Sequence, residues 1–138
     1  MAALQDKTAL VTGASRGIGR ATASALAHAG AHVLVHYGHS AQDAESLVAA
    51  IRSKGGRADA IRADLGTPEG ATLLANEVRS IVGQRLDVLV SNAGISKAAT
   101  FKDHTVRILT ASLQRMCAAR FSWCSNSSPS SVKARTSL

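Results

Sequence analysis

The sequence predicts an α/β fold with a doubly wound parallel sheet, and three observations lead to this prediction. A short apolar, partly β-branched run at residues 8–12 is typical of a strand buried on both faces of a sheet. A glycine-rich turn joins that run to a segment with helical apolar spacing. Further strand-like and helical segments then alternate, which is the pattern of parallel strands joined by right-handed helical crossovers.

The glycine-rich turn spans residues 12–19 and has the spacing Gly-x3-Gly-x-Gly. This differs from the Gly-x-Gly-x-x-Gly of the commonest dinucleotide fingerprint. We expect Gly13 to allow the tight turn, Gly17 to let the backbone approach a pyrophosphate, and Gly19 to let helix and strand pack closely. Because a helix begins here, its free N–H groups and its dipole favour an anion. The turn is therefore a candidate phosphate site.

The expected strands and helices alternate through the first ninety residues. Gly30 and the pair Gly55-Gly56 are placed to end the first two helices. Ser40 is placed to cap the second helix, with Asp43 at the capping-box position. The predicted strands lie at about residues 8–11, 31–36, 58–63 and 86–90, and the predicted helices at about 16–28, 41–54 and 68–82.

Length and composition fit one α/β domain with a modest core. The chain has 138 residues, of which 46% are hydrophobic and 3% aromatic. No apolar run approaches the roughly twenty residues of a membrane span. The N-terminus lacks the basic and then apolar pattern of a signal peptide. We therefore expect a cytoplasmic protein with no membrane partner.

The formal net charge of +7 is concentrated in the C-terminal tail. Residues 1–106 hold eleven Lys/Arg against nine Asp/Glu, whereas residues 107–138 hold five Lys/Arg and no acid. The tail also contains Trp123 and both cysteines, Cys117 and Cys124, whose spacing matches no metal-ligand pattern. A basic-tailed nucleic-acid binder would need interleaved aromatics or a recognised fold, and the tail has neither. We expect no metal and no nucleic-acid partner.

Two further segments accompany the glycine turn. Asp64 and Leu65 follow the third predicted strand, and Ser91-Asn92-Ala93-Gly94 follows the fourth. Together with the turn, they resemble the short-chain dehydrogenase/reductase family of NAD(P)(H)-dependent Rossmann oxidoreductases, most closely its 3-oxoacyl-(acyl-carrier-protein) reductase branch. The resemblance runs from about Asp6 to about Val106. It implies the N-terminal half of a Rossmann-type sheet at residues 1–106, followed by an atypical, Ser-rich tail at residues 107–138.

The resemblance also implies a set of cofactor-binding residues. The Asp64 carboxylate would accept a hydrogen bond from the adenine amino group, and Leu65 would line the adenine pocket. Asn92 would brace the central sheet, and the two residues after it would leave room beside the nicotinamide ribose. The alternative for Asp64 is a simple helix cap. The full implied set is Gly13, Ser15, Arg16, Gly17, Ile18, Gly19, Ser40, Asp64, Leu65, Asn92, Ala93 and Gly94.

The end of the second strand indicates which dinucleotide would bind. A carboxylate there would hydrogen-bond the adenosine ribose hydroxyls and repel a 2′-phosphate. The segment 37–40 contains no carboxylate, while Ser40, His39 and Arg16 can supply a hydroxyl and positive charge. We therefore expect NADP(H) rather than NAD(H). The alternative for His36 and His39, each taken singly, is an ordinary solvent-exposed loop residue.

The family's reaction is hydride transfer between NADPH and a small carbonyl or alcohol substrate. It needs a Tyr-x3-Lys pair and a serine that orients the substrate. The one tyrosine, Tyr37, lies in the adenosine region without that lysine spacing. We expect no catalytic residue, no turnover and no family tetramer interface in the chain as written. Two readings stay open: an oxidoreductase fragment that binds NADP(H), or a non-catalytic remnant or inactive truncated product.

The tail suggests a change of reading frame. With permitted codons for residues 107–117, one added G after the codon for Val106 gives Glu-Asp-Phe-Asp-Arg-Leu-Phe-Ala-Thr-Asn-Val, a helical sequence of the family's kind. The family's active-site asparagine then falls where this chain has Met116, which has a single codon. We hypothesise that the tail is the out-of-frame product of a one-base deletion, either natural or introduced in sequencing. Sequencing the codons for His104 to Thr110 from an independent DNA preparation tests this. An extra base there would indicate a full reductase that was misread, and a confirmed deletion would leave at most a cofactor-binding remnant.

Overall fold

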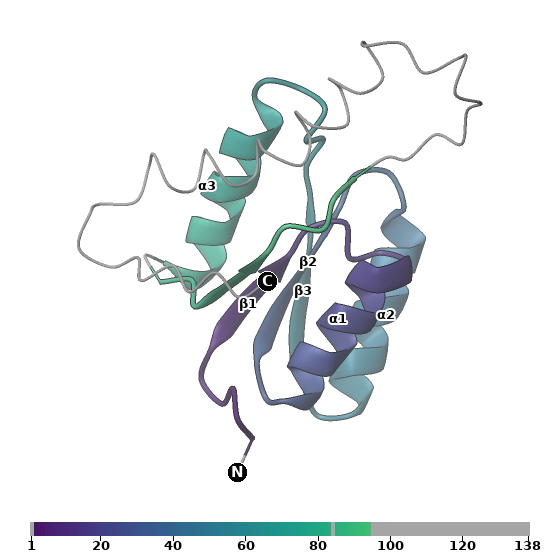
Figure 1. Cartoon of the computed structure of the whole chain (residues 1–138), viewed down its shortest axis with the longest axis vertical. Helices are drawn as coiled ribbons and strands as arrows, with labels where there is room; N and C mark the ends of the chain where they lie inside the picture. The colour runs from purple at the N-terminus through teal and green to yellow at the C-terminus, as the bar shows by residue number, and fades with distance from the viewer. Residues whose placement is uncertain (1, 84, 95–138) are drawn as a thin grey trace, which may run out of the picture.

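The computed structural model describes residues 2–83 and 85–94, which form a four-stranded parallel sheet with helices on both faces (Figure 1). The strand order is β3-β2-β1-β4, so β1 lies inside the sheet and pairs with both β2 and β4. This confirms the predicted fold class, and the ends of the elements lie within about two residues of their predicted positions. The elements are β1 (Thr8–Val11), α1 (Gly17–His28), β2 (His32–Tyr37), α2 (Ala41–Ser53), β3 (Arg57–Arg62), α3 (Gly70–Val82) and β4 (Val88–Val90).

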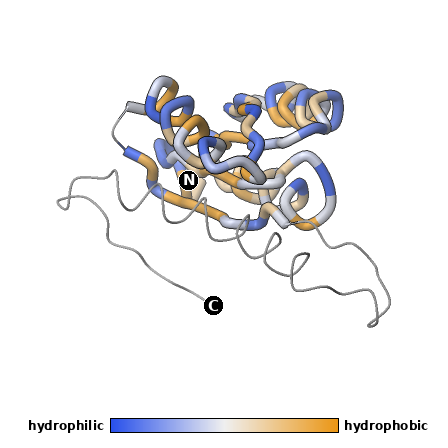
Figure 2. The backbone as a smooth tube through the Cα atoms, turned by 90° about the horizontal axis from the view of Figure 1, so that it is seen from above, coloured by the Kyte–Doolittle hydropathy of each residue, from blue (hydrophilic) through white to orange (hydrophobic). Residues whose placement is uncertain are grey.

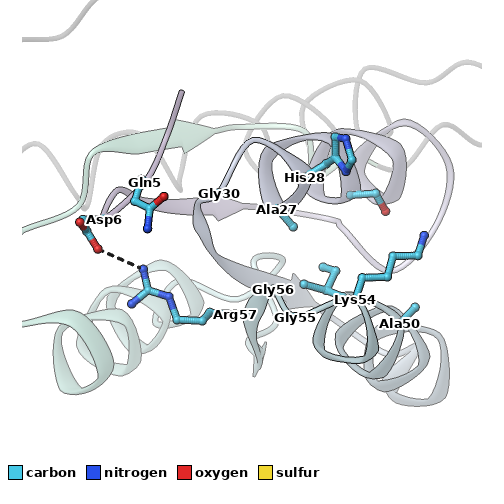
Figure 3. Close-up of a pocket in the computed structure, with 12 residues that line it drawn as sticks. Gln5, Asp6, Ala27, His28, Gly30, Ala50, Lys54, Gly55, Gly56 and Arg57 are labelled. Carbon is cyan, nitrogen blue, oxygen red and sulfur yellow. Dashed lines mark ion pairs between the residues drawn. The ribbon is translucent and has the colours of Figure 1, made fainter. Parts of the chain in front are cut away.

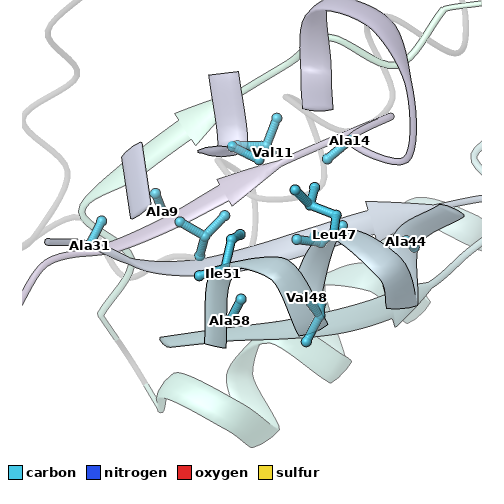
Figure 4. Close-up of a cluster of buried hydrophobic side chains, with 12 residues drawn as sticks. Ala9, Val11, Ala14, Ala31, Ala44, Leu47, Val48, Ile51 and Ala58 are labelled. Carbon is cyan, nitrogen blue, oxygen red and sulfur yellow. The ribbon is translucent and has the colours of Figure 1, made fainter. Parts of the chain in front are cut away.

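The apolar strands separate two hydrophobic clusters, one on each face of the sheet. Val11 and Val33 point to one face, where α1 and α2 cover them and Leu47 and Ile51 complete the cluster (Figure 4). Leu10 and Leu34 point to the other face, which α3 covers. Seen from above in Figure 2, polar residues line the outer sides of the helices. Alternate burial on two covered faces explains why β1 and β2 are almost continuously apolar.

Glycine ends α1 and α2, as predicted. Gly30 has φ +96° and donates to the carbonyl of Ala27, while Ala31 donates to the carbonyl of Leu26. Gly55 has φ +82° and begins the same pair of bonds at the end of α2. Both ends are Schellman motifs, in which a left-handed residue lets the last carbonyls find donors. Each helix can therefore turn back sharply into the next strand.

Asp87 ties the beginning of β4 to the beginning of β1. Its carboxylate accepts the N–H of Thr8 at 3.0 Å and pairs with Arg85 at 2.9 Å and Lys7 at 3.5 Å. Burial would raise the pKa of Asp87, but the Thr8 N–H and the two cations outweigh it and hold that pKa below its usual 3.8. These contacts fix the register of β4 against β1 at the amino ends of the two strands.

The predicted boundary at Val106 and the tail with its cysteines and tryptophan lie outside the described residues. Within the described part, no helix combines the length and the apolar character that crossing a bilayer requires.

Candidate functional site

The segments that the sequence predicted to bind a dinucleotide lie together at one edge of the sheet. All four strands are parallel, so their carboxyl ends meet at that edge. The glycine turn follows β1, residues 38–40 follow β2, residues 63–65 follow β3 and residues 91–94 follow β4. The carboxyl edge of an open parallel sheet, where neighbouring loops separate, is where such folds bind nucleotides.

Thr12 and Asn92 lock the glycine turn to the end of β4. The Thr12 hydroxyl, which is fully buried, accepts the N–H groups of Asn92 at 2.9 Å and Ala93 at 3.0 Å, and donates to the carbonyl of Val90 at 3.3 Å. The side-chain amide of Asn92 donates to the carbonyls of Thr12 and Gly13, each at 3.2 Å. The position that the resemblance assigned to Asn92, bracing the sheet, is the one observed. The part played by the Thr12 side chain was not predicted.

The three glycines of the turn meet different surroundings. A Cβ at Gly13, which has φ +64°, would lie 2.9 Å from the Cα of Ala93. A Cβ at Gly19 would overlap the Asn92 amide and the Gly13 carbonyl. At Gly17, which has φ +58°, a Cβ would meet nothing within 4 Å. Gly13 and Gly19 therefore allow close packing, whereas Gly17 combines a left-handed backbone with open space, as a turn that admits a phosphate requires.

His36 is buried beneath this turn. Its side chain is 2% exposed, Nδ1 accepts the N–H of Gly13 at 3.1 Å, and Nε2 lies 2.9 Å from the carbonyl of Ala63. Burial lowers the pKa of His36 from its usual 6.5, although the bond to Ala63 opposes that shift. The interpretation of His36 as an exposed loop residue is therefore wrong, because His36 lies within the apolar strand β2 and its ring is buried. His39 is exposed, as that interpretation expected.

Arg16 bridges the glycine turn and the start of α2. One terminal nitrogen of its guanidinium donates to the Ser40 hydroxyl at 2.9 Å, and its Nε lies 3.5 Å from the Asp43 carboxylate. Ser40 is the N-cap residue of α2, but its side chain caps no helix N–H, so the predicted capping box is wrong: the hydroxyl bonds to Arg16 instead. Arg20 adds a second link, donating to the carbonyls of Ser15 and Asp43. The sequence did not single out Arg20, nor the pairing of Asp43 with Arg16.

The remaining predicted residues lie around the same edge. The Asp64 carboxylate is exposed and accepts the N–H of Gly66 at 2.8 Å, while α3 begins only at Gly70 with Glu69 at its N-cap. The helix-cap alternative for Asp64 is therefore wrong. Leu65 is buried, and the side chain of Ile18 is 79% exposed at the start of α1. Ala93 is half-buried and Gly94 exposed.

A cavity of about 430 Å³ lies at the opposite end of the sheet (Figure 3). Residues from the N-terminal segment and the ends of α1 and α2 line it, including His28 and Lys54. Asp6 and Arg57 form an ion pair of 3.7 Å at its rim. None of the predicted cofactor-binding residues lines it, and it faces the amino ends of the strands, where parallel sheets do not bind nucleotides. Among the described residues, no group of three or more metal-binding side chains is placed to hold an ion.

The geometry defines an α/β protein with a glycine turn between β1 and α1, and comparison with known proteins gives its family. The model of the family described as short chain dehydrogenase matches residues 7–136. The chain belongs to the short-chain dehydrogenase/reductase family.

Individual relatives agree with the family assignment. Versicolorin reductase 1 of Aspergillus parasiticus is 50% identical over 103 residues, which cover 74% of this chain and 38% of the relative. A short-chain dehydrogenase of Burkholderia cenocepacia, solved in complex with NADP, is 40% identical with a TM-score of 0.79 over 91% of this chain and 52% of that one. A 3-oxoacyl (acyl-carrier-protein) reductase of Agrobacterium tumefaciens with NADP bound is 34% identical with a TM-score of 0.78 over 91% of this chain and 48% of that one. The chain thus spans about half or less of the length of these relatives.

Proposed function

We propose that this chain binds NADP(H) at the carboxyl edge of its sheet. The observation that carries the proposal is the contact of Arg16 with Ser40, which brings a guanidinium and a hydroxyl together beside the end of β2. In a dinucleotide site of this fold, that place receives the adenosine ribose, where an acidic residue selects NAD and a basic one accepts the 2′-phosphate. The two relatives solved with NADP support the choice.

Different residues of the site would contact different parts of the dinucleotide. The turn at Gly17 leaves space for the pyrophosphate at the N-terminus of α1, whose first turn contains no acid to repel it. The second carboxylate oxygen of Asp64 would receive the adenine amino group, and Leu65 would pack on the ring. Ala93, whose N–H donates to the Thr12 hydroxyl, and Gly94 would flank the nicotinamide ribose.

We propose that the reaction class is that of the family, an oxidoreductase acting on a small carbonyl or alcohol compound. The bound dinucleotide supplies or accepts the hydride. The described residues bind and orient it, and no tyrosine among them has a lysine four positions later. We therefore expect residues 2–94 to contribute cofactor binding without the proton donor. The sequence motifs favour the branch of 3-oxoacyl-(acyl-carrier-protein) reductases. The Agrobacterium relative supports that branch, whereas the versicolorin reductase supports a different one.

Titration of the purified chain with NADPH and NADH, followed by isothermal calorimetry, tests the proposal. We expect saturable binding of NADPH and weaker binding of NADH, with the difference reduced at high salt because the 2′-phosphate contact is exposed. Equal affinities would contradict the phosphate role of Arg16 and Ser40. Binding of neither dinucleotide would overturn the proposal and favour the second candidate, an inactive product that does not bind the cofactor.

We also propose that residues 107–138 are the product of a frame change. Their excess of basic residues and serine, and the family-like sequence obtained with one added base, support this. Sequencing independent DNA across the codons for His104 to Thr110 tests it. An extra base there would show that the sequence was misread and would restore the family frame. An unchanged sequence in independent preparations would show that the deletion is present in the gene.

A further inference from the structure

His36 contacts two parts of the candidate site through one ring. Its Nδ1 faces the N–H of Gly13 in the glycine turn, and its Nε2 faces the carbonyl of Ala63, the residue before Asp64. Its own backbone carbonyl also accepts the N–H of Ala14 at 2.9 Å. Two successive residues of the turn are thus held by one residue of β2.

The partners of the ring fix its protonation state. A backbone N–H can only donate, so the nitrogen that faces Gly13 must be an unprotonated acceptor. A carbonyl can only accept, so the nitrogen that faces Ala63 must carry the hydrogen. The arrangement therefore requires the neutral Nε2–H tautomer. A doubly protonated ring would turn an N–H toward the Gly13 N–H and lose that bond.

We propose that His36 is a positioning residue for the dinucleotide, its neutral ring holding the glycine turn and the segment before Asp64 at a fixed separation. The inference rests on the proposed NADP(H) site, because it assigns no contact between His36 and the cofactor. Gly13 is packed against the backbone of Ala93, so a turn released from His36 would also disturb the residues assigned to the nicotinamide ribose.

Among the residues that the structure describes, none forms an ion pair with His36 that would stabilise a charged ring. The neighbouring side chains on the same face of the sheet are apolar, namely Leu34 and Ile61. Burial lowers the pKa of His36 below 6.5, so the ring is neutral at pH 7. The titratable and charged groups on β2, β3, α3, the glycine turn and the segments that follow β2 and β3 are Arg16, His32, Tyr37, His39, Arg57, Asp59, Arg62, Asp64, Glu69, Glu77 and Arg79. Asp59 is engaged by His32 and Arg52.

Three variants of the full chain test the positioning role. His36→Asn keeps one acceptor and one donor, His36→Leu keeps neither, and His28→Leu removes an exposed histidine at the far end of α1 as a matched control. We expect His36→Leu to weaken NADPH binding by about tenfold or more, as the loss of a hydrogen bond to a buried group predicts. We expect His36→Asn to recover most of that affinity and His28→Leu to bind with an affinity within about twofold of the wild type.

The tautomer of the His36 ring can be measured in the wild-type chain, so this readout does not require a variant to fold. In a ¹⁵N spectrum of the wild-type chain, we expect His36 to show the Nε2–H tautomer at pH 7 and the Gly13 amide to exchange slowly. As the pH falls through the lowered pKa of His36, NADPH affinity should fall in the wild type and not in His36→Asn.

The outcomes separate this inference from the proposed function. Failure of the wild type to bind any dinucleotide would overturn both. Wild-type binding together with equal binding by His36→Leu, or with an Nδ1–H ring, would overturn the positioning role alone and leave the NADP(H) site standing.

Discussion

Thr12 and Asn92 hold each other through backbone and side chain at once, although 80 residues separate them in the sequence. The hydroxyl of Thr12 accepts the backbone N–H of Asn92, and the side-chain amide of Asn92 donates back to the backbone carbonyl of Thr12. Each residue thereby provides a hydrogen-bond partner for a backbone group of the other. The contact makes the shape of the glycine turn depend on the position of β4.

Thr12→Val should destabilise the protein while keeping the size and branching of the side chain. The variant leaves the N–H groups of Asn92 and Ala93 without the hydroxyl acceptor, at a cost of about 2–4 kcal/mol in the free energy of unfolding. Urea denaturation measures the change. Thr12→Ser keeps the hydroxyl and should lose less than half as much. Equal losses in the two variants would contradict this expectation, because the methyl group would then contribute as much as the hydrogen bonds.

Gly19→Ala should disturb the site from inside the first turn of α1. The added methyl group would overlap the Asn92 amide and the Gly13 carbonyl, and we expect a loss of about 1–3 kcal/mol together with weaker NADPH binding. Gly38→Ala is the matched control, because a Cβ there meets nothing within 4 Å. Thermal unfolding and NADPH titration of both variants check the prediction, which fails if the two behave alike.

Arg16→Gln should separate the two dinucleotides. Its guanidinium is the charged group beside Ser40, so removing it should weaken NADPH binding by roughly tenfold and leave NADH binding nearly unchanged. Calorimetric titration with both dinucleotides measures the ratio. Arg62→Gln, which also removes an exposed arginine, should leave the ratio as it is. A parallel loss of NADPH and NADH affinity in Arg16→Gln would point to a structural role instead.

Asp43→Asn should strengthen NADPH binding. The Asp43 carboxylate pairs with Arg16 at 3.5 Å and would compete with a 2′-phosphate for the same guanidinium. Because the pair is exposed, the gain should be modest, roughly two- to fivefold. Glu45→Gln removes the same charge two residues further along α2 and controls for net charge. An equal gain in both variants would assign the effect to the overall field rather than to Asp43.

Asp87 should make the fold sensitive to acid. Its pKa is held below 3.8 in the folded state, so the unfolded chain takes up the proton first as the pH falls. The stability that Asp87 contributes is therefore complete above about pH 5 and is lost as the pH falls through 3.8 and then through the lower folded pKa. Urea denaturation between pH 6 and pH 2.5 should show a smaller decline in Asp87→Asn than in the wild type.

The sequence predicts the strands, helices and glycine turn well because each has a local cause. Apolar β-branched runs, helical spacing and the glycines after α1 and α2 act within a few residues of the structure they produce. The turn at residues 12–19 is recognisable for the same reason, since its backbone needs positive φ angles and close packing that glycine allows.

Contacts between distant segments were not predictable in the same way. The role of His36 depends on β2 lying between β1 and β3, and only that order places its ring between Gly13 and Ala63. One signal was present: a histidine within the apolar strand at residues 32–37, where a buried side chain needs two partners. The hydroxyl of Ser40 accepts a hydrogen bond from Arg16 instead of one from a helix N–H, because a charged donor forms the stronger hydrogen bond.

The order of the strands also has a consequence for how the protein folds. β1 gains its neighbour β2 after about twenty residues, but its other neighbour, β4, arrives only when residues 88–90 have been made. The contacts of Thr12 with Asn92 must therefore wait for closure of a loop of some 80 residues, which is a slow and entropically costly event. On a ribosome, the glycine turn emerges early and takes its final shape late, so the proposed nucleotide site is among the last parts of the sheet to form.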